Sequence, residues 1–190
     1  MSALGVQTLP ARLAGYISKH DSRIMRRVHR WPAPRWLRLF MIAATRGGDG
    51  WLWYGVGALL LIFGGPQRHV AVVTAGLSSA VGLAVYLVLK RATRRKRPCN
   101  LEPHCWARLI PPDQYSFPSG HSITAFAVAT SLSFFYPTLA ASLFCAALCN
   151  SISRIILGMH FLSDVVAGAL IGVGLACGAH QLLALAAFTI

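Results

Sequence analysis

The chain has 190 residues, of which 55% are hydrophobic, with a mean hydropathy of +0.56 and a formal net charge of +13 at pH 7. A composition that is both so apolar and so basic predicts an integral membrane protein with one membrane domain. It argues against a nucleic-acid-binding module, which needs a polar scaffold of its own, so we expect membrane lipids and no nucleic acid as partners.

Residues 1–46 are expected to form a basic, amphipathic segment that lies on the membrane surface. Apolar residues recur there at helical spacing, whereas most of the basic residues fall on other positions of the same helix. Such a face suits anionic lipid, and the segment lacks the apolar run of a cleaved signal peptide. Pro32 and Pro34 are expected to end the helix, and residues 36–45 form a second short apolar piece.

Residues 47–190 are expected to form an all-α transmembrane domain of about five helices, which begins at a glycine-rich turn. Each predicted span is uncharged, and the long ones match a hydrocarbon core of about 30 Å. Tyr136 and Pro137 divide one uncharged stretch into two shorter spans. The predicted spans are residues 50–67, residues 70–89, the two halves of residues 122–153, and residues 165–190.

The last predicted span is rich in small residues. Glycines with G-x-x-x-G spacing permit close contact between helices, so we interpret them as packing positions. His180 is alone in this span, and we leave it outside the candidate site because a lone histidine near a helix end is usually solvated or satisfied. The glycines are Gly168, Gly172, Gly174 and Gly178.

One substantial polar loop, residues 90–118, separates the spans and is the natural roof of a site. It contains Cys99, His104 and Cys105, but two thiols and one imidazole without a fourth ligand make a weak metal site. We therefore expect no metal and no cofactor. A disulfide between Cys99 and Cys105 depends on the compartment that the loop faces, and it stays open.

Three reactive side chains interrupt the apolar second half of the chain. Arg154, His160 and Asp164 are the only charged or imidazole-bearing residues between Ser122 and Ala179, and such residues in membrane segments mark functional sites. His160 and Asp164 are four residues apart, so on a helix the carboxylate can accept the imidazole N–H. The other ring nitrogen is then free as a nucleophile or base, and Arg154 supplies a planar cation for an anion.

Two further segments carry groups that suit a phosphate. Lys90 and Arg97 are seven residues apart, two helical turns, so both can point the same way if the helix continues that far. Ser119 and Gly120 immediately precede a span, where free backbone N–H groups favour an anion, a serine can cap the helix and a glycine allows close approach. His121, on the first turn, could donate a proton.

The predicted topology brings these segments together. Seventeen of the 18 Lys and Arg residues fall on one side of the membrane, and only Arg68 falls on the other. Part of the basic loop is expected to be a solvated or lipid-facing charge cluster with no role in the site. This cluster comprises Arg91, Arg94, Arg95 and Lys96.

Three strings, K-x6-R-P, P-S-G-H and S-R-x5-H-x3-D, occur in this order at residues 90–98, 118–121 and 153–164. Together they resemble the tripartite signature of the type 2 phosphatidic acid phosphatase (PAP2) superfamily, without a departure. The resemblance covers roughly residues 47–190 and implies a PAP2/haloperoxidase-like helical core. The soluble vanadium haloperoxidases of the same superfamily lack such spans, which argues against that branch.

The resemblance also implies roles for the site residues. His160 would attack phosphorus to form a phosphohistidine, Asp164 would orient that ring, and His121 would protonate the leaving alkoxide and then activate water. Because the cations neutralise charge and Asp164 is the only nearby acid, the reaction is expected to need no metal. The implied phosphate-binding residues are Lys90, Arg97, Ser119, Gly120 and Arg154.

The signature does not distinguish between lipid phosphates. The superfamily includes phosphatases of phosphatidic acid, phosphatidylglycerophosphate, lipid A and undecaprenyl pyrophosphate, and the short chain resembles small bacterial members. We therefore expect a bacterial polyprenyl pyrophosphate or phospholipid phosphatase that crosses the cytoplasmic (inner) membrane several times. A lipid phosphotransferase with the same site and a non-catalytic anionic-lipid binder or transporter are the alternatives, and the leaflet and oligomeric state stay open.

Overall fold

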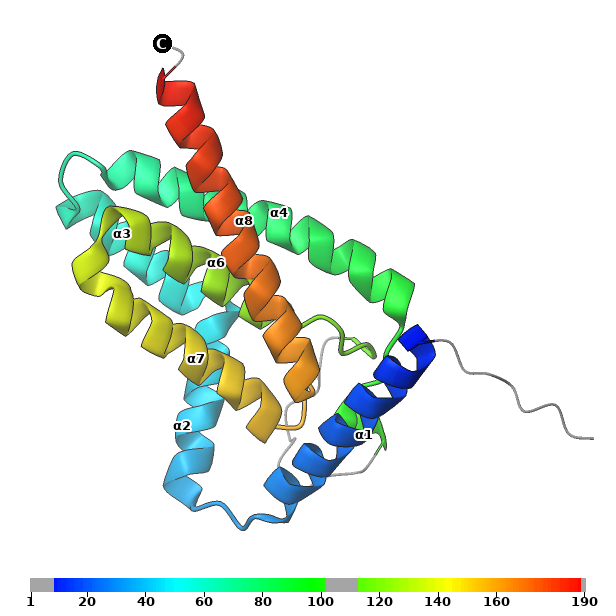
Figure 1. The fold of residues 1–190 in the computed structure, drawn as a ribbon. Helices are drawn as coiled ribbons and strands as arrows, with labels where there is room; N and C mark the ends of the chain where they lie inside the picture. Colours follow the sequence, from blue (N-terminus) through cyan, green and yellow to red (C-terminus); the bar gives the residue numbers. More distant parts are fainter. Residues whose placement is uncertain (1–8, 102–112, 189–190) are drawn as a thin grey trace, which may run out of the picture.

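The computed structural model describes residues 9–101 and 113–188, which form helices and connecting turns with one isolated β-bridge and no strand. The protein is thus all-α, as predicted, and Figure 1 shows its helices in chain order. The helices are α1 (Leu9–Arg30), α2 (Arg35–Arg46), α3 (Leu52–Phe63), α4 (Arg68–Thr93), α5 (Pro98–Leu101), α6 (Gly120–Phe135), α7 (Ala140–Ile156) and α8 (Leu162–Phe188), with a π-helical stretch η1 (Gly47–Trp51) and a 3-10 turn η2 (Pro137–Leu139).

Within residues 9–101 and 113–188, three helical segments are long and apolar enough to cross a membrane, namely Arg68–Thr93, Pro137–Ile156 and Leu162–Ala186. They correspond to three of the five predicted spans, which supports an integral membrane protein. The other two predicted spans form α3 and α6, which have 12 and 16 residues. At 1.5 Å per residue α6 is about 24 Å long, shorter than a typical hydrocarbon core.

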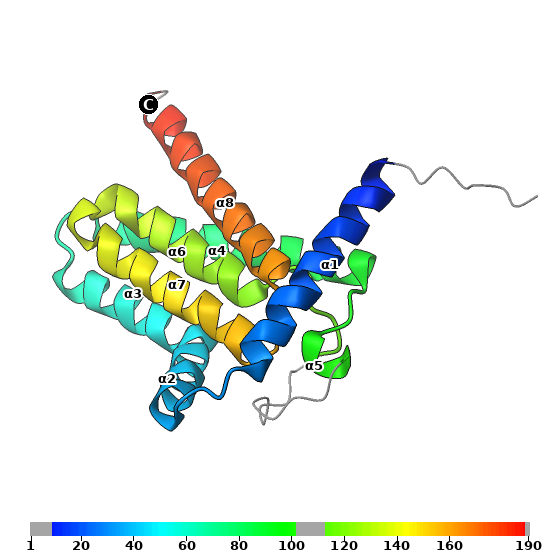
Figure 2. The ribbon, with the colours of Figure 1, turned by 60° about the horizontal axis from the view of Figure 1, so that its bottom comes forward.

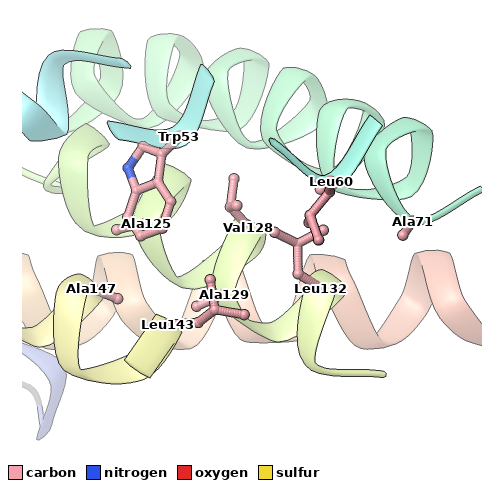
Figure 3. Packing of buried hydrophobic residues seen from close by; sticks show 10 residues of the cluster. Trp53, Leu60, Ala71, Ala125, Val128, Ala129, Leu132, Leu143 and Ala147 are labelled. Atoms are coloured by element: carbon pink, nitrogen blue, oxygen red, sulfur yellow. The ribbon is translucent and has the colours of Figure 1, made fainter. Parts of the chain in front are cut away.

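Helix α6 is the centre of the bundle, and α8, α4 and α7 pack around it. Alanines at 125, 127 and 129 are fully buried, and such small side chains allow neighbouring helices to come close. Figure 3 shows how α6 meets α3, α4 and α7 in one apolar cluster. This cluster comprises Trp53, Leu60, Ala71, Ala75, Ala125, Val128, Ala129, Leu132, Leu143 and Ala147.

The packing role predicted for the glycines of the last span is confirmed for the first pair. A Cβ on Gly168 would lie 2.6 Å from the carbonyl oxygen of Ser119, and a Cβ on Gly172 would lie 2.9 Å from the backbone nitrogen of Ala127, so α8 needs glycine at both. The prediction is wrong for Gly174 and Gly178, because a Cβ there would have no atom within 4 Å. Gly174 and Gly178 instead line a pocket together with residues of α4.

The helix breaks near the N-terminus lie where the prolines predict them. Helix α1 ends at Arg30, before Pro32, and α2 begins at Arg35, after Pro34. Helix α1 packs against α8 and α7, and α2 packs along α7. The N-terminal segment therefore contacts the helices that carry the third sequence string.

The two ends of the bundle differ in chemistry. The turns that join α3 to α4 and α6 to α7 lie at one end, and the last residues of α4 and α7 and the first residues of α8 lie at the other, beside α1 (Figures 1 and 2). Arg68 belongs to the first end, at the start of α4, whereas Lys90, Arg154 and His160 belong to the second. The three sequence strings thus meet at one end of the bundle.

Candidate active site

His160 lies in the turn between α7 and α8, and two features of the backbone hold this turn. The N–H groups of Met159 and His160 both donate to the carbonyl oxygen of Arg154, at 3.0 and 3.2 Å. Gly158 has a φ of 70°, and a Cβ there would lie 3.0 Å from the ring of His29, so a side chain would be strained and crowded. His160 is thereby placed just before the first turn of α8.

The ring of His160 has one tautomer that fits its neighbours. Its Nδ1 lies 2.6 Å from the carbonyl oxygen of Ser116, which can only accept, so Nδ1 carries the proton. Its Nε2 lies 3.2 Å from Nη1 of Arg97 and keeps its lone pair. Burial lowers the pKa of His160 to about 4, aided by the charges of Arg154 and Arg97 and opposed by Asp164, so the ring is neutral at pH 7.

The predicted helical pairing of His160 with Asp164 is wrong in its geometry, although the two groups are close. His160 lies outside the helix, and its Nδ1 is 3.7 Å from Oδ2 of Asp164, longer than a hydrogen bond. The ring proton is instead donated to the carbonyl of Ser116 in the polar loop. Asp164 therefore acts on His160 as a nearby charge and not as its hydrogen-bond acceptor.

Asp164 is fully buried at the N-terminus of α8 and has partners of its own. Its Oδ2 accepts the N–H of Phe161 at 2.8 Å, and its Oδ1 accepts Nη1 of Arg95 at 2.7 Å. The prediction that Arg95 is solvated is therefore wrong. The negative charge of Asp164 attracts Arg95 toward the site. The other three residues of the predicted charge cluster, Arg91, Arg94 and Lys96, are exposed.

Lys90 and Arg97 converge on one carboxylate, but not by sharing a helix face as predicted. Helix α4 ends at Thr93 because Arg94 adopts a left-handed φ of 47°, so Arg97 lies in the loop that turns back. Lys90 contacts Oδ2 of Asp113, and Nη2 of Arg97 lies 3.0 Å from its Oδ1. Burial raises the pKa of Asp113, but the hydrogen bond from Lys90 and the charge of Arg97 outweigh it and lower the pKa.

Arg154 is buried near the end of α7 and is incompletely paired. Its Nη1 donates to Oγ1 of Thr45 on α2 at 2.6 Å. Its Nε is buried and has no hydrogen-bond partner among the described residues, an arrangement that costs free energy unless another acceptor binds. Arg154 and Arg97 both lie within electrostatic reach of His160 and His121. The two guanidinium groups thus connect the two histidines.

The predicted helix start at residues 119–121 is confirmed. Ser119 caps α6, its Oγ accepting the N–H of Ser122 at 3.4 Å, and its own N–H donates to the carbonyl oxygen of Asp164 at 3.0 Å. A Cβ on Gly120 would lie 3.1 Å from the ring of Tyr86, which accounts for glycine there. The second and third sequence strings are therefore joined by a backbone hydrogen bond.

His121 lies on the first turn of α6 and pairs with a second carboxylate. Its Nε2 is 2.7 Å from Oδ1 of Asp49, which comes from the π-helical stretch η1. Gly50, with a φ of 125°, forms the kink that directs this stretch into α3. A pocket of about 280 Å³ adjoins His121 and is lined also by Tyr54 and Leu83, both largely exposed.

The sequence interpretation missed several residues that complete this site, and its prediction that Asp164 is the only nearby acid is wrong. Asp49, Asp113 and Ser116 each contact a predicted site residue, and Arg95 contacts Asp164. A signal was present, because the whole chain has only five Asp and Glu residues against 18 Lys and Arg. Every acidic residue that the structure describes pairs with a cation or a histidine; these are Asp21, Asp49, Asp113 and Asp164.

The cysteine question concerns the same loop. The backbone N–H of Cys99 donates to the carbonyl oxygen of Gly158 at 3.1 Å, so this part of the loop contacts the turn that carries His160. Cys105 and His104 lie outside the described residues. The disulfide between Cys99 and Cys105 stays open.

Comparison with known proteins places these residues in a family. The PAP2 superfamily model matches residues 71–186. A decaprenylphosphoryl-5-phosphoribose phosphatase of Mycobacterium tuberculosis is 33% identical over 145 residues, which cover 70% of this chain and 75% of that protein. An undecaprenyl-diphosphatase of Sulfolobus acidocaldarius is 30% identical over 133 residues, covering 70% of this chain and 64% of that protein.

A solved structure is similar over most of the fold. The crystal structure of Aquifex aeolicus LpxE matches with a TM-score of 0.72 and 28% sequence identity, and the match covers 84% of this chain and 93% of that chain. The match includes most of the helices described above, so the arrangement of the bundle is shared with that protein.

Proposed function

Because the chain belongs to the PAP2 superfamily, we propose that it is a membrane lipid phosphatase that hydrolyses a phosphomonoester or pyrophosphate headgroup. The observation that carries this proposal is the environment of His160. Ser116 holds the proton on Nδ1, so Nε2 carries the lone pair, which Nη1 of Arg97 contacts at 3.2 Å and which must leave that contact to attack phosphorus. A neutral imidazole with a fixed tautomer and an adjacent guanidinium is suited to attack phosphorus.

In the first step, Nε2 of His160 forms a bond to phosphorus in line with the bond to the leaving oxygen, which breaks. The ring becomes positively charged, and Asp164 at 3.7 Å stabilises that charge. His121 starts this step in its protonated form, paired with Asp49 at 2.7 Å, gives a proton to the leaving oxygen and becomes neutral. The product is a phosphohistidine and a free lipid alcohol or lipid monophosphate.

In the second step, His121 accepts a proton from water, whose oxygen attacks phosphorus and breaks the bond to Nε2. Inorganic phosphate leaves and His160 regains its neutral form. The phosphate oxygens are held throughout by Lys90, Arg97, Arg154 and the backbone N–H of Gly120, while Ser119 caps the helix and bonds to the backbone of Asp164. The buried Nε of Arg154 supplies a donor that no described residue satisfies.

The substrate class that we propose is a polyprenyl pyrophosphate such as undecaprenyl pyrophosphate, or phosphatidic acid or phosphatidylglycerophosphate. The pocket beside His121 lies among η1, α4 and α6, and its lining residues Tyr54 and Leu83 are 74% and 55% exposed. A lipid could keep its tail in the bilayer against these side chains while its headgroup reaches the histidine. Relatives with the names given above act on polyprenyl compounds.

We propose further that residues 47–190 form the catalytic domain, with five crossings of a bacterial cytoplasmic membrane, and that residues 1–46 lie at its surface. The reaction is proposed to need no metal, since the carboxylates of Asp49, Asp113 and Asp164 are each engaged by a histidine or cation. A Mg²⁺ ion would have to displace these partners.

The test is release of inorganic phosphate by the purified protein in detergent from a panel of phosphatidic acid, phosphatidylglycerophosphate and undecaprenyl pyrophosphate. We expect release from at least one lipid, unchanged by EDTA, and a phosphoryl group on His160 in samples quenched without acid. Lipid binding without release, equal in His160→Ala, would show a binder. If the phosphoryl group appears only on an added second lipid, and not as inorganic phosphate, the protein is a phosphotransferase.

A further inference from the structure

Helix α1 places one acidic side chain against the turn that carries His160. Asp21 is 4% exposed, although the neighbouring positions 19 and 23 on the same helix are exposed. Its Oδ1 accepts the backbone N–H of Ser163 at 3.1 Å, and its Oδ2 accepts the hydroxyl of the same serine at 2.5 Å. Asp21 thus satisfies an N–H of the first turn of α8, which no residue within that helix can reach.

Arg95 joins Asp21 to Asp164. Its Nη2 lies 2.6 Å from Oδ2 of Asp21, and its Nη1 lies 2.7 Å from Oδ1 of Asp164 and 2.7 Å from the hydroxyl of Ser163. The guanidinium also stacks over the ring of Phe161, with its carbon 4.3 Å from the ring centroid. The planar cation of Arg95 is therefore held between two buried carboxylates, and Ser163 and Phe161 also contact it.

The charges in this group have a direct consequence for His160. With Asp21 present, the positive charge of Arg95 is shared between two carboxylates, so Asp164 keeps much of its negative charge for the nearby ring. Without the charge on Asp21, Arg95 would be balanced by Asp164 alone, and less negative charge would remain to stabilise a phosphorylated, cationic imidazole. Asp21 and Asp164 are both buried, so water screens the interaction between these charges little.

We infer that Asp21 is a positioning residue of the active site, which acts through Arg95 to orient and charge-balance Asp164 beside His160. The inference rests on the proposed function and extends it to the N-terminal helix. Helix α1 is then part of the catalytic unit and not only a basic surface anchor. Asp21 contacts Arg95 and Ser163, so it acts on the histidine through Arg95, and we expect its effect on the chemical step.

The alternative is that Asp21 only fastens α1 to the bundle. Met25, buried at 5% on the same helix, fastens it by packing, so a purely structural role predicts that Asp21→Asn and Met25→Ala act alike. The two roles differ in their dependence on Arg95. A residue that works through Arg95 loses its influence when Arg95 has no charge, whereas a fastening residue keeps it.

The test is a double-mutant cycle of Asp21→Asn and Arg95→Gln in the full chain, with kcat and KM measured on one lipid phosphate in detergent. We expect Asp21→Asn to lower kcat by tenfold or more, up to about 10²-fold, and to change KM by less than about twofold. In the Arg95→Gln background, the same change should leave kcat unchanged or raise it, because an uncompensated carboxylate is removed. Asp21→Glu should recover part of the activity.

Ser22→Ala is the matched control, because it lies next to Asp21 and its hydroxyl bonds only within α1, to the carbonyl oxygen of Ser18. Losses that multiply in the double variant, or a fall in thermal stability at unchanged kcat, would overturn the inference. If Asp21→Asn does not fold, Asp21→Glu replaces it in both backgrounds, with the same expectation that its effect on kcat disappears when Arg95 is Gln. Absence of phosphate release by the unaltered protein would refute the proposed function instead, so the two failures are distinct.

Discussion

His160 and His121 each pair with one carboxylate, but the two pairs differ in how far they are removed from water. His160 is 2% exposed beside the fully buried Asp164, and backbone or guanidinium groups occupy both of its ring nitrogens. The side chain of His121 is 22% exposed, its partner Asp49 is 54% exposed, and a pocket adjoins it. One pair is enclosed, whereas the other is open to the pocket.

This difference matches the two tasks of the proposed mechanism. A nucleophile gains from a fixed tautomer and a dry, preorganised environment, because no reorganisation is needed when phosphorus is attacked. A general acid and base must exchange protons with a leaving group and with water, so it needs access to the pocket. The same pair of residue types thus serves two purposes through its surroundings.

The largest expected effect comes from removing the enclosed ring. His160→Ala should abolish phosphate release, a loss of at least about 10³-fold, because no other group can accept the phosphoryl. Arg91→Ala should keep most of the activity, since Arg91 is exposed and lies outside the site. Phosphate release from a lipid phosphate measures both. Equal losses would indicate a general electrostatic role of this end of the bundle and would remove the distinction between the pairs.

A smaller loss is expected when only the enclosed carboxylate changes. Asp164→Asn keeps the size of the side chain but removes the charge that stabilises the phosphorylated ring, so kcat should fall by about 10²-fold or more. The amount of trapped phosphohistidine should fall with it. A variant that accumulates as much phosphohistidine as the unaltered protein would show that Asp164 does not act in the first step.

Removal of the carboxylate charge should lower activity less in the open pair of His121 and Asp49. Asp49→Asn should lower kcat by about tenfold, since water partly screens the charge of an exposed carboxylate and His121 can still exchange protons with solvent. The comparison is made under the same assay as Asp164→Asn, with His121→Asn as the reference for complete loss of the group. An effect of Asp49→Asn larger than that of Asp164→Asn would reverse the assignment of the two pairs.

The smallest expected change is the response of His160 to mild acid. Its pKa is lowered from 6.5 to about 4, so the ring stays neutral between pH 8 and pH 5 and is protonated only as the pH falls through about 4. NMR of histidine labelled with nitrogen-15 measures this, with His160→Ala to assign the signal. Titration of that signal near pH 6.5 would show that the pair is not enclosed.

Much of the fold could be predicted because apolar runs and prolines act locally. The breaks at Pro32 and Pro34, the helix start at Ser119 and the close packing at Gly168 follow from side-chain shape and backbone geometry within a few residues. The open surroundings of Gly174 could not be predicted in this way. Gly174 lies on a different face of α8 from Gly172, beside a pocket that α4 also lines, and the docking of whole helices decides which face is covered.

The candidate site divides in the same manner. His160, Asp164 and Arg154 were recognisable since few charged residues occur in the apolar half of the chain. The role of Arg95 was not, because four neighbouring basic residues look alike in the sequence and only one faces Asp164. The carbonyl of Ser116, which holds the ring of His160, belongs to the backbone and has no residue signature.

The amino-acid sequence by itself determined the class of protein and the reactive groups, because membrane burial makes charged side chains rare and phosphate chemistry requires particular ones. Only the tertiary structure decided which carboxylate serves which cation. Asp21 meets Arg95 from 74 residues away, and Asp49 meets His121 from 72 residues away. Such pairs depend on how whole helices dock, and docking is a property of the assembled bundle that no local pattern records.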